Sequence, residues 1–345
     1  MSKTTSGLWP IHLKPKDDEL LSSWLIRLAT AHKMHPKTFY SIELPENPNF
    51  LKRIDETEDP KSLKWISQKT GVSLGEVEAT TLAYYGERSF FQYPSPRANP
   101  FPWYMSFDWI MPISYEPVNE FFGIQFCPQC LQEDDEPYFR RKWRFAFVTH
   151  CKKHRVMLLD RCTKCGASIN FLNNTYKSEL KIRRISMIRC RSCDADIRRV
   201  ARQSVPCSVD SKEIQYQEHL VSLLDGCWWK TNRGESFTST SYFRVLHKLM
   251  KVLAFDELGL FLRVTIMRLY KLPISTVKKI NHNCLERLSI SERRELLILA
   301  RRIIKDWPGY FSTLEALMKE ILPPYRQSEL RYYGELNRRG TSEFN

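Results

Sequence analysis

Apolar residues recur at helical spacing in the first part of the chain. Residues 15–29 carry an apolar stripe that follows three acidic residues. Acidic residues at the N-terminus of a helix stabilise it, because they interact favourably with the positive end of the helix dipole. The first helix is therefore predicted to be amphipathic, and its stripe must pack against another element. A second short helix is predicted over residues 37–44, before a proline-rich break. The stripe of the first helix consists of Leu21, Trp24, Leu25 and Leu28.

Residues 61–85 contain two short apolar-periodic segments separated by Gly71, a pattern that predicts a helix-turn-helix. The second segment stands where a recognition helix would lie. It offers Glu76 and Glu78 and no Lys, Arg, Asn or Gln with which to read base edges or hold phosphates. We therefore expect this module to pack against a protein partner or against other helices rather than to read DNA.

Residues 90–122 combine many aromatic side chains with several prolines. Prolines exclude long helices, and so many rings would be poorly solvated in a structureless linker. This segment is therefore predicted to be an ordered, packed connector. A platform on which bases stack is the alternative.

The chain after Cys193 is predicted to be helical, and residues 269–285 form a second helix-turn-helix candidate. Four side chains of this segment could face phosphates or base edges, and a solvated basic face on a bundle helix is the alternative. They are Lys278, Lys279, Asn281 and His282.

A long amphipathic helix is predicted next, because Ser289 and Glu292 stand at capping-box spacing ahead of an apolar-periodic segment. Basic residues lie along this helix, and Arg301 and Arg302 are further candidate nucleic-acid contacts. The polar tail at 326–345 is expected to be mobile or to become ordered on a partner.

Cysteine and histidine residues between positions 127 and 193 fall into four pairs, each with two residues inside the pair. This spacing lets a tight turn aim both ligands at one tetrahedral ion, and two such pairs close a four-coordinate zinc shell. Pairing in chain order assigns the first zinc to Cys127, Cys130, Cys151 and His154. It assigns the second zinc to Cys162, Cys165, Cys190 and Cys193.

Three alternatives compete with this assignment. His150 could replace His154, although it lacks the two-residue gap from Cys151. Disulfides would require an oxidising compartment, whereas the N-terminus shows no secretory signal pattern. A nucleophilic Cys/His pair built on Cys151 is the enzymatic alternative. Because protein ligands complete both shells, two structural zinc ions are expected, and three cysteines are left as core thiols: Cys207, Cys227 and Cys284.

The formal net charge of +14 is concentrated from the cysteine region onward. Residues 1–125 carry 13 Lys and Arg against 15 Asp and Glu, residues 126–200 carry 17 against 8, and residues 201–345 carry 23 against 16. Seven zinc-bound thiolates and two dications would leave the chain near +11. A basic surface of this kind attracts the phosphate backbone of nucleic acid, with solubility alone as the alternative.

Several common functions lack their sequence signatures. No run approaches the roughly 20 apolar residues that a membrane span needs, so we expect a soluble, cytoplasmic protein without a membrane partner. The GxxxxGK[ST] phosphate loop, the GxSxG elbow and the HExxH motif are absent. The chain is therefore not expected to be an enzyme.

Six motifs follow one another between residues 15 and 166. They are PxDDELLSSWLIRLA at 15–29, CPxC at 127–130, an aromatic and basic segment at 138–148, HCxxH at 150–154, Leu-Leu-Asp at 158–160 and CxxCG at 162–166. This ordered set resembles the TniQ/TnsD family of transposon target-selection proteins, over most of residues 8–195. Residues 306–311 are also similar to the C-terminal helical region of the larger, TnsD-like members.

The resemblance implies an accessory role in transposition. Members of the family mark the insertion site and recruit a TnsC-like AAA+ ATPase, which licenses the transposase. Some recognise attachment-site DNA directly, while shorter members ride on an RNA-guided CRISPR Cascade complex with its guide RNA and target DNA. The present chain has the length of the shorter, CRISPR-associated kind. Members also commonly act as head-to-tail dimers, and such a protein would associate with the bacterial nucleoid when active.

Together these features predict a mainly α protein with a double zinc-ribbon-like centre. The expected function is that of an adaptor between a target-bound complex, RNA-guided in the first instance, and the transposition ATPase. Direct recognition of an attachment site, as in TnsD-like proteins, is the alternative. The predicted parts are an N-terminal helix-turn-helix-like module (1–89), the proline/aromatic connector (90–125), the double zinc module (126–200), a C-terminal helical domain (201–325) and the polar tail (326–345).

Overall fold

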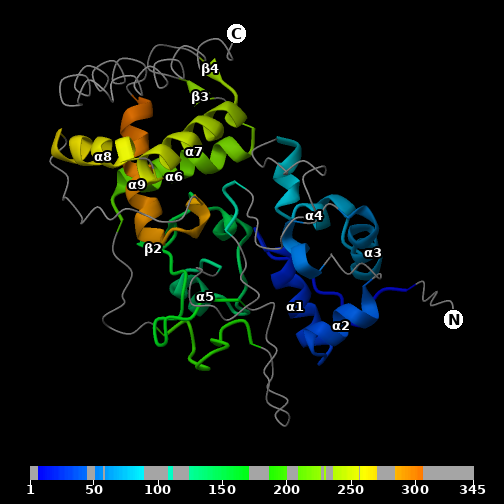
Figure 1. The fold of residues 1–345 in the computed structure, drawn as a ribbon. Coiled ribbons are helices and arrows are strands. Elements are labelled where there is room, and N and C mark those ends of the chain that lie inside the picture. The colour runs from blue at the N-terminus through cyan, green and yellow to red at the C-terminus, as the bar shows by residue number, and fades with distance from the viewer. Residues whose placement is uncertain are drawn as a thin grey trace. The chain divides into compact units, whose positions relative to one another are not determined.

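The computed structural model confirms that the protein is mainly helical (Figure 1). The chain divides into two compact units, Met1–Glu218 and His219–Asn345. Within the described residues, strands are short and form two-stranded antiparallel sheets. The structure describes residues 7–44, 51–56, 59–88, 108–111, 124–170, 186–199, 209–226, 229–230, 236–255, 257–269 and 284–305.

The N-terminal helices follow the predicted order. The α-helices are α1 (Leu21–Ala31), α2 (Pro36–Glu43), α3 (Pro60–Thr70) and α4 (Leu74–Glu78). Two 3₁₀ helices, η1 (Leu51–Glu56) and η2 (Ala83–Arg88), accompany them. The apolar stripe predicted for the first helix is completely buried, and it forms the centre of this group of helices.

The acidic residues ahead of α1 do not act on the helix dipole as predicted. The helix begins only at Leu21, and its first turn holds no acidic residue. Glu19 is instead buried beside Arg27, with 2.6 Å between its Oε2 and the guanidinium Nη1. Asp18 lies 3.4 Å from Nε of Arg141. Both carboxylates are therefore engaged in ion pairs with arginines.

The predicted helix-turn-helix is formed by α3 and α4. Asp59 caps the start of α3, whose first residue is Pro60, and Gly71 ends the helix with a φ of 70° that suits glycine. Ser73 and Glu76 then form a capping box that starts α4. Local sequence signals thus define both ends of the turn.

In the cysteine-rich part of the first unit, the described residues form one α-helix, one 3₁₀ helix and one small hairpin. Its elements are α5 (Pro128–Glu133), the 3₁₀ helix η3 (Arg141–Arg144), β1 (His150–Cys151) and β2 (Val156–Met157). Strands β1 and β2 are antiparallel, with Cys151 opposite Val156. This arrangement brings the second ligand pair back toward the first, because Phe126 also bridges to Leu159.

The helical module and the cysteine-rich region are joined through buried polar contacts. The Leu20 N–H donates to the carbonyl of Phe139 at 2.9 Å. Arg144 of η3 and Asp55 of η1 are both fully buried, with 2.7 Å between Nη1 and Oδ2. The same Asp55 carboxylate accepts hydrogen bonds from the backbone N–H and the hydroxyl of Ser22 in α1. Residues 89 positions apart are therefore packed into one core.

The second unit is built from α7 (Ser239–Phe255), α8 (Glu257–Leu269) and α9 (Ile290–Lys305), which pack on one another (Figure 1). Helix α6 (Ser211–Leu224) runs across the boundary between the units. A hairpin of β3 (Trp229–Lys230) and β4 (Ser236–Phe237) precedes α7, and the 3₁₀ helix η5 (Leu285–Arg287) precedes α9. The Ser289–Glu292 capping box predicted for α9 is present.

Gly259 allows α8 to approach α7 closely. A Cβ added at Gly259 would lie 1.7 Å from the carbonyl oxygen of Val252, so the backbone would have to move. We expect Gly259→Ala to lower the free energy of unfolding by about 1–3 kcal/mol through this overpacking. The matched control is Gly75→Ala in α4, where a Cβ meets nothing within 4 Å and should stabilise by up to about 1 kcal/mol.

Thermal melts of the two glycine variants provide the measurement. Opposite shifts of Tm are expected, since both glycines lie in helices and differ in what a methyl group would meet. Equal shifts of the same sign would contradict the close approach of α7 and α8.

Several predicted features lie outside the described residues. These are most of the aromatic connector, the segment 270–283 and the polar tail. Among the helices that are described, none has both the length and the apolar character needed to cross a bilayer.

Candidate metal centres

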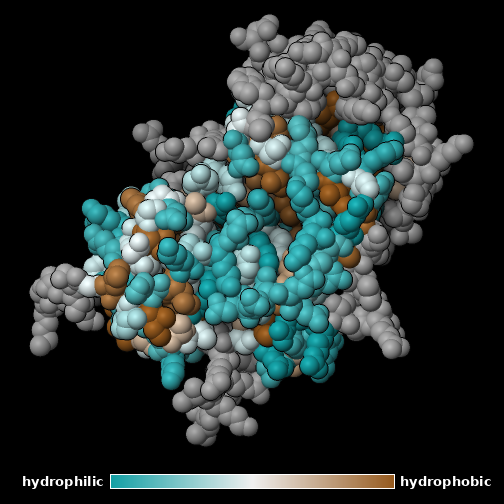
Figure 2. Space-filling view, turned by 180° about the vertical axis from the view of Figure 1, so that it is seen from behind, coloured by the Kyte–Doolittle hydropathy of each residue, from teal (hydrophilic) through white to brown (hydrophobic). Residues whose placement is uncertain are grey.

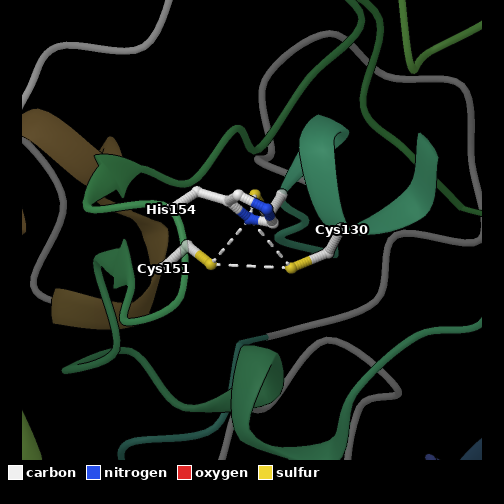
Figure 3. Close-up of side chains that lie close together, drawn as sticks. Cys130, Cys151 and His154 are labelled. Carbon is white, nitrogen blue, oxygen red and sulfur yellow. Dashed lines mark hydrogen bonds between the residues drawn. The ribbon is translucent and has the colours of Figure 1, made fainter. Parts of the chain in front are cut away.

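The first ligand cluster brings together four side chains from two pairs (Figure 3). Cys127 precedes α5, Cys130 lies within α5, Cys151 is in β1 and His154 is in the turn that follows. The Nδ1 atom of His154 lies 3.4 Å, 3.3 Å and 3.5 Å from the sulfurs of Cys127, Cys130 and Cys151. The sulfurs of Cys130 and Cys151 are 3.5 Å apart. All four ligand atoms therefore converge on one point.

These separations fit a tetrahedral zinc ion. Zn–S bonds of about 2.3 Å and Zn–N bonds of about 2.1 Å place tetrahedral ligands roughly 3.6–3.8 Å apart. The observed distances of 3.3–3.5 Å are slightly shorter. Three sulfurs and one imidazole nitrogen are also a donor set that zinc prefers. The residues present thus fit a zinc ion in number, chemistry and spacing.

Glu133 orients the histidine of this cluster. Its Oε1 lies 2.9 Å from Nε2 of His154, and a carboxylate can only accept, so Nε2 carries the proton. The lone pair of Nδ1 then points at the sulfurs. Metal-binding histidines commonly donate their second N–H to a carboxylate in this way. The Nζ atom of Lys153 lies 2.6 Å from Oε2 of Glu133, so His154 and Lys153 share this carboxylate.

The structure separates the two histidine alternatives. His154 lies in the cluster, whereas the Nδ1 of His150 is 3.1 Å from the hydroxyl of Thr149. Gln217 of α6 accepts from the backbone N–H groups of Thr149 and His150 and donates to the His150 carbonyl. His150 is thus part of the support for β1, while its neighbour Cys151 faces the cluster.

The second cluster joins Cys162, Cys165, Cys190 and Cys193. The sulfurs of Cys162 and Cys193 are 3.7 Å apart, as are those of Cys165 and Cys190. Both values match the separation of about 3.75 Å expected for two sulfurs on tetrahedral zinc. Cys162 and Cys190 are buried and Cys165 is exposed, so this site lies nearer the surface.

Three ligand pairs close with the same backbone turn. In each, the residue four positions after the first cysteine donates its N–H to that cysteine's carbonyl, at 2.8 Å, 2.9 Å and 2.8 Å. The donating residues are Arg155, Gly166 and Asp194, and all three have a positive φ. Glycine adopts this conformation freely, and aspartate tolerates it better than arginine does. The turn aims both ligands of a pair to the same side.

The sulfurs of the first cluster influence one another's ionisation. Hydrogen bonds from Cys127 and Cys130 lower the pKa of Cys151 below the ordinary thiol range. Hydrogen bonding to Cys127 and Cys151, followed by burial, raises the pKa of Cys130. In the second cluster, burial raises the pKa of Cys190 to about 12. Several thiolates can be held so close together when a divalent cation neutralises them.

Four protein donors surround each centre, which is the arrangement of structural zinc sites. A catalytic zinc keeps one position for water, and neither tetrad leaves one. Cys151 has three further ligand-type atoms around it, so metal binding accounts for its surroundings better than a nucleophilic Cys/His pair does. The two tetrads are therefore consistent with two structural zinc ions.

The structure brings none of the candidate nucleic-acid residues into a described binding site. Lys278, Lys279, Asn281 and His282 lie outside the described residues. Arg301 and Arg302 are half-buried on α9. Burial and then the charge of Arg301 lower the pKa of His219, which places this guanidinium beside α6 within the second unit. Glu133 was missed by the sequence reasoning, although its position three residues after Cys130 in the same short helix was a usable signal.

A mainly helical chain with two zinc-type tetrads belongs to the class of metal-stabilised folds. Residues 10–158 match the TniQ family, so the chain contains a TniQ domain over this range. Proteins of this family are non-catalytic adaptors, and the domain implies a role in transposition target selection. No curated protein matches the chain. The matched range contains the complete first cluster and ends before Cys162.

Proposed function

We propose that this protein is the adaptor that links a target-bound complex to the AAA+ regulator of transposition. The observation that carries the proposal is that the TniQ range holds the complete first metal cluster and the N-terminal helices, which the buried Asp55–Arg144 ion pair joins to the cysteine-rich region. The target-bound complex that we propose first is an RNA-guided Cascade effector.

Exposed apolar side chains of the N-terminal module support a protein partner for this module. Figure 2 shows hydrophobic surface among the polar atoms at the left of this face, where the N-terminal helices lie. Side chains of this kind are enriched in protein interfaces and do not hold phosphates. The exposed large apolar residues are Leu8, Ile11, Ile42, Leu74 and Tyr84.

A binding assay with purified components tests the adaptor role. We expect the zinc-loaded chain to bind both the ATPase and the guide complex, measured by co-sedimentation or fluorescence anisotropy. Leu8→Ser combined with Ile42→Ser should weaken binding to one of them at least tenfold, since buried apolar side chains contribute about 1.5–3 kcal/mol each. The exposed pair Lys61→Ser and Lys64→Ser is the matched control on the same module.

Two results would contradict the adaptor role. One is a zinc-loaded chain that binds neither partner, and the other is equal loss of binding in the apolar and lysine double variants. Circular dichroism melts of each variant would show whether the fold is retained.

Direct recognition of attachment-site DNA is the second candidate function. It is favoured by the positive charge that accumulates from residue 126 onward, and it would use the segment 269–285 with Lys278, Lys279, Asn281 and His282. Gel shifts separate the two functions. The adaptor predicts weak, salt-sensitive binding of any duplex, whereas the direct reader predicts an attachment site bound at least a thousandfold more tightly than random DNA.

The division of the chain into modules, its oligomeric state and its location are also proposals. We propose modules at 1–89, 126–200 and 201–325, separated by the connector 90–125 and followed by the tail 326–345. A homodimer and a location at the bacterial nucleoid fit an adaptor of this kind. Sedimentation of the zinc-loaded chain over a range of concentrations measures the oligomeric state.

A further inference from the structure

The solvent face of α7 is entirely basic. Three residues of this helix are exposed, namely Arg244, Lys248 and Lys251. The other described faces of the helix are half-buried or buried, and Tyr242, Phe243, Leu246, Met250 and Leu253 supply its buried apolar side. Every fully exposed position of α7 thus carries a positive charge.

No carboxylate compensates this charge on the helix itself. The segment Ser239–Phe255 contains no Asp or Glu, and the nearest acidic residues along the chain are Glu235 and Asp256. Among the described residues, no ion pair or side-chain hydrogen bond involves any of the three cations. Two exposed lysines of the first unit are neutralised, because Lys152 pairs with Glu218 and Lys153 with Glu133. Within the part of the chain that the structure describes, the positive charge of the basic face of α7 therefore has no neutralising ion pair.

The spacing of the three cations suits a polyanion. Positions 244, 248 and 251 lie within about 60° of one another around a helix and span roughly 10 Å along it. Duplex DNA presents one phosphate per strand for about every 3.4 Å of its axis, so three phosphates of one strand fall within this length. Protein interfaces have an apolar or aromatic centre, and no exposed apolar side chain lies among these three.

We propose that the α7 face, defined by Arg244, Lys248 and Lys251, binds the phosphate backbone of duplex DNA without reading its sequence. Duplex DNA is favoured over duplex RNA because its wide major groove admits a helix, whereas the major groove of A-form RNA is too narrow. Phosphate contacts fix position and orientation but carry no sequence information. The inference does not rest on the adaptor role, since it concerns the purified chain and DNA alone.

The test measures binding of the zinc-loaded full chain to a random duplex of 20 base pairs over a range of salt concentrations. In the triple variant Arg244→Gln, Lys248→Gln and Lys251→Gln, affinity at 100 mM salt should fall about tenfold or more. The slope of log K against log salt should become shallower by about 2–3, close to one per lost phosphate contact. A single Lys248→Gln change should make the slope shallower by about 1.

The control removes the same amount of charge from the N-terminal helices. Lys14, Lys61 and Lys64 are exposed there, and their triple glutamine variant should keep nearly the full salt slope. Equal weakening in both triple variants would overturn the proposal, because net charge alone would explain it. Tighter binding of a 20-base-pair RNA duplex, or loss of ATPase binding with DNA binding intact, would also overturn it. Failure of the ATPase to bind any variant would leave this result unaffected.

Discussion

Cys130→Ser is expected to remove one zinc ion and to unfold the TniQ domain at temperatures at which the unaltered chain remains folded. Cys130 is buried, and its sulfur contacts both Cys151 and His154. Structural zinc in small domains contributes an apparent 10–16 kcal/mol, which is about as large as the entire stability of a typical domain. Loss of one ligand therefore removes more free energy than the packed helices can replace.

Two measurements check the effect of Cys130→Ser. Metal analysis should fall from two zinc equivalents to one, and the thermal transition of the first unit should move down by tens of degrees or broaden. Chelation of the unaltered chain should give the same change. Cys284→Ser is the matched control, because Cys284 lies outside both tetrads and its contact with Glu286 can be made by a hydroxyl. Two equivalents of zinc and an unchanged Tm in Cys130→Ser would refute the first metal centre.

The second large effect is expected for Arg144→Met, which should lower the free energy of unfolding by about 3–5 kcal/mol. Arg144 and Asp55 are each 0% exposed, and the arginine also contacts Glu56 and donates to the carbonyl of Met111. Removing the guanidinium leaves the Asp55 carboxylate buried without its cation. Arg144→Met combined with Asp55→Leu should recover a large part of the loss, since no uncompensated charge remains there.

The deficit of Arg144→Met should grow with pH. Burial raises the pKa of Asp55 to about 6, although Arg144 acts to lower it. A carboxyl whose pKa is raised on folding adds stability below its unfolded pKa of about 3.8 and loses it as pH rises through its folded pKa. Without Arg144 the pKa of Asp55 in the folded state rises further. The variant therefore continues to lose stability as the pH rises above 6, whereas the stability of the unaltered chain no longer falls there through Asp55.

Urea unfolding at pH 5 and pH 8 measures this dependence. The exposed ion-pair variant Lys152→Met is the control and should leave stability nearly unchanged at both values. A deficit of Arg144→Met that is equal at both pH values, or larger at pH 5, would show that Asp55 is not the group left uncompensated.

The metal clusters could be predicted from the sequence, because each ligand pair is defined by residues only a few positions apart. A CxxC or CxxH pair specifies one turn, and the structure shows the same hydrogen bond closing three of them. The ends of α3 and α4 were equally local, since Gly71 and the Ser73–Glu76 box act within a few residues. Signals of this kind do not depend on how distant segments pack.

Long-range packing produced the features that the sequence did not predict. The buried pairing of Glu19 with Arg27 was not predicted, and Glu136 approaches the same guanidinium from far along the chain. The Asp55–Arg144 ion pair could not be predicted either, since the sequence around each residue carries no sign that the two pack together. The basic face of α7 was different, because the absence of acidic residues between 239 and 255 is a sequence property that pattern reading overlooked.

Asp55 contacts both Ser22 of α1 and Arg144 of η3. The next element along the chain after η3 is β1, the strand that holds Cys151. An oxidant that strips the metal from this tetrad would therefore disable the amino-terminal helices as well, although they supply no ligand. Oxidation of a few sulfur atoms is thus expected to loosen packing well beyond the metal centre.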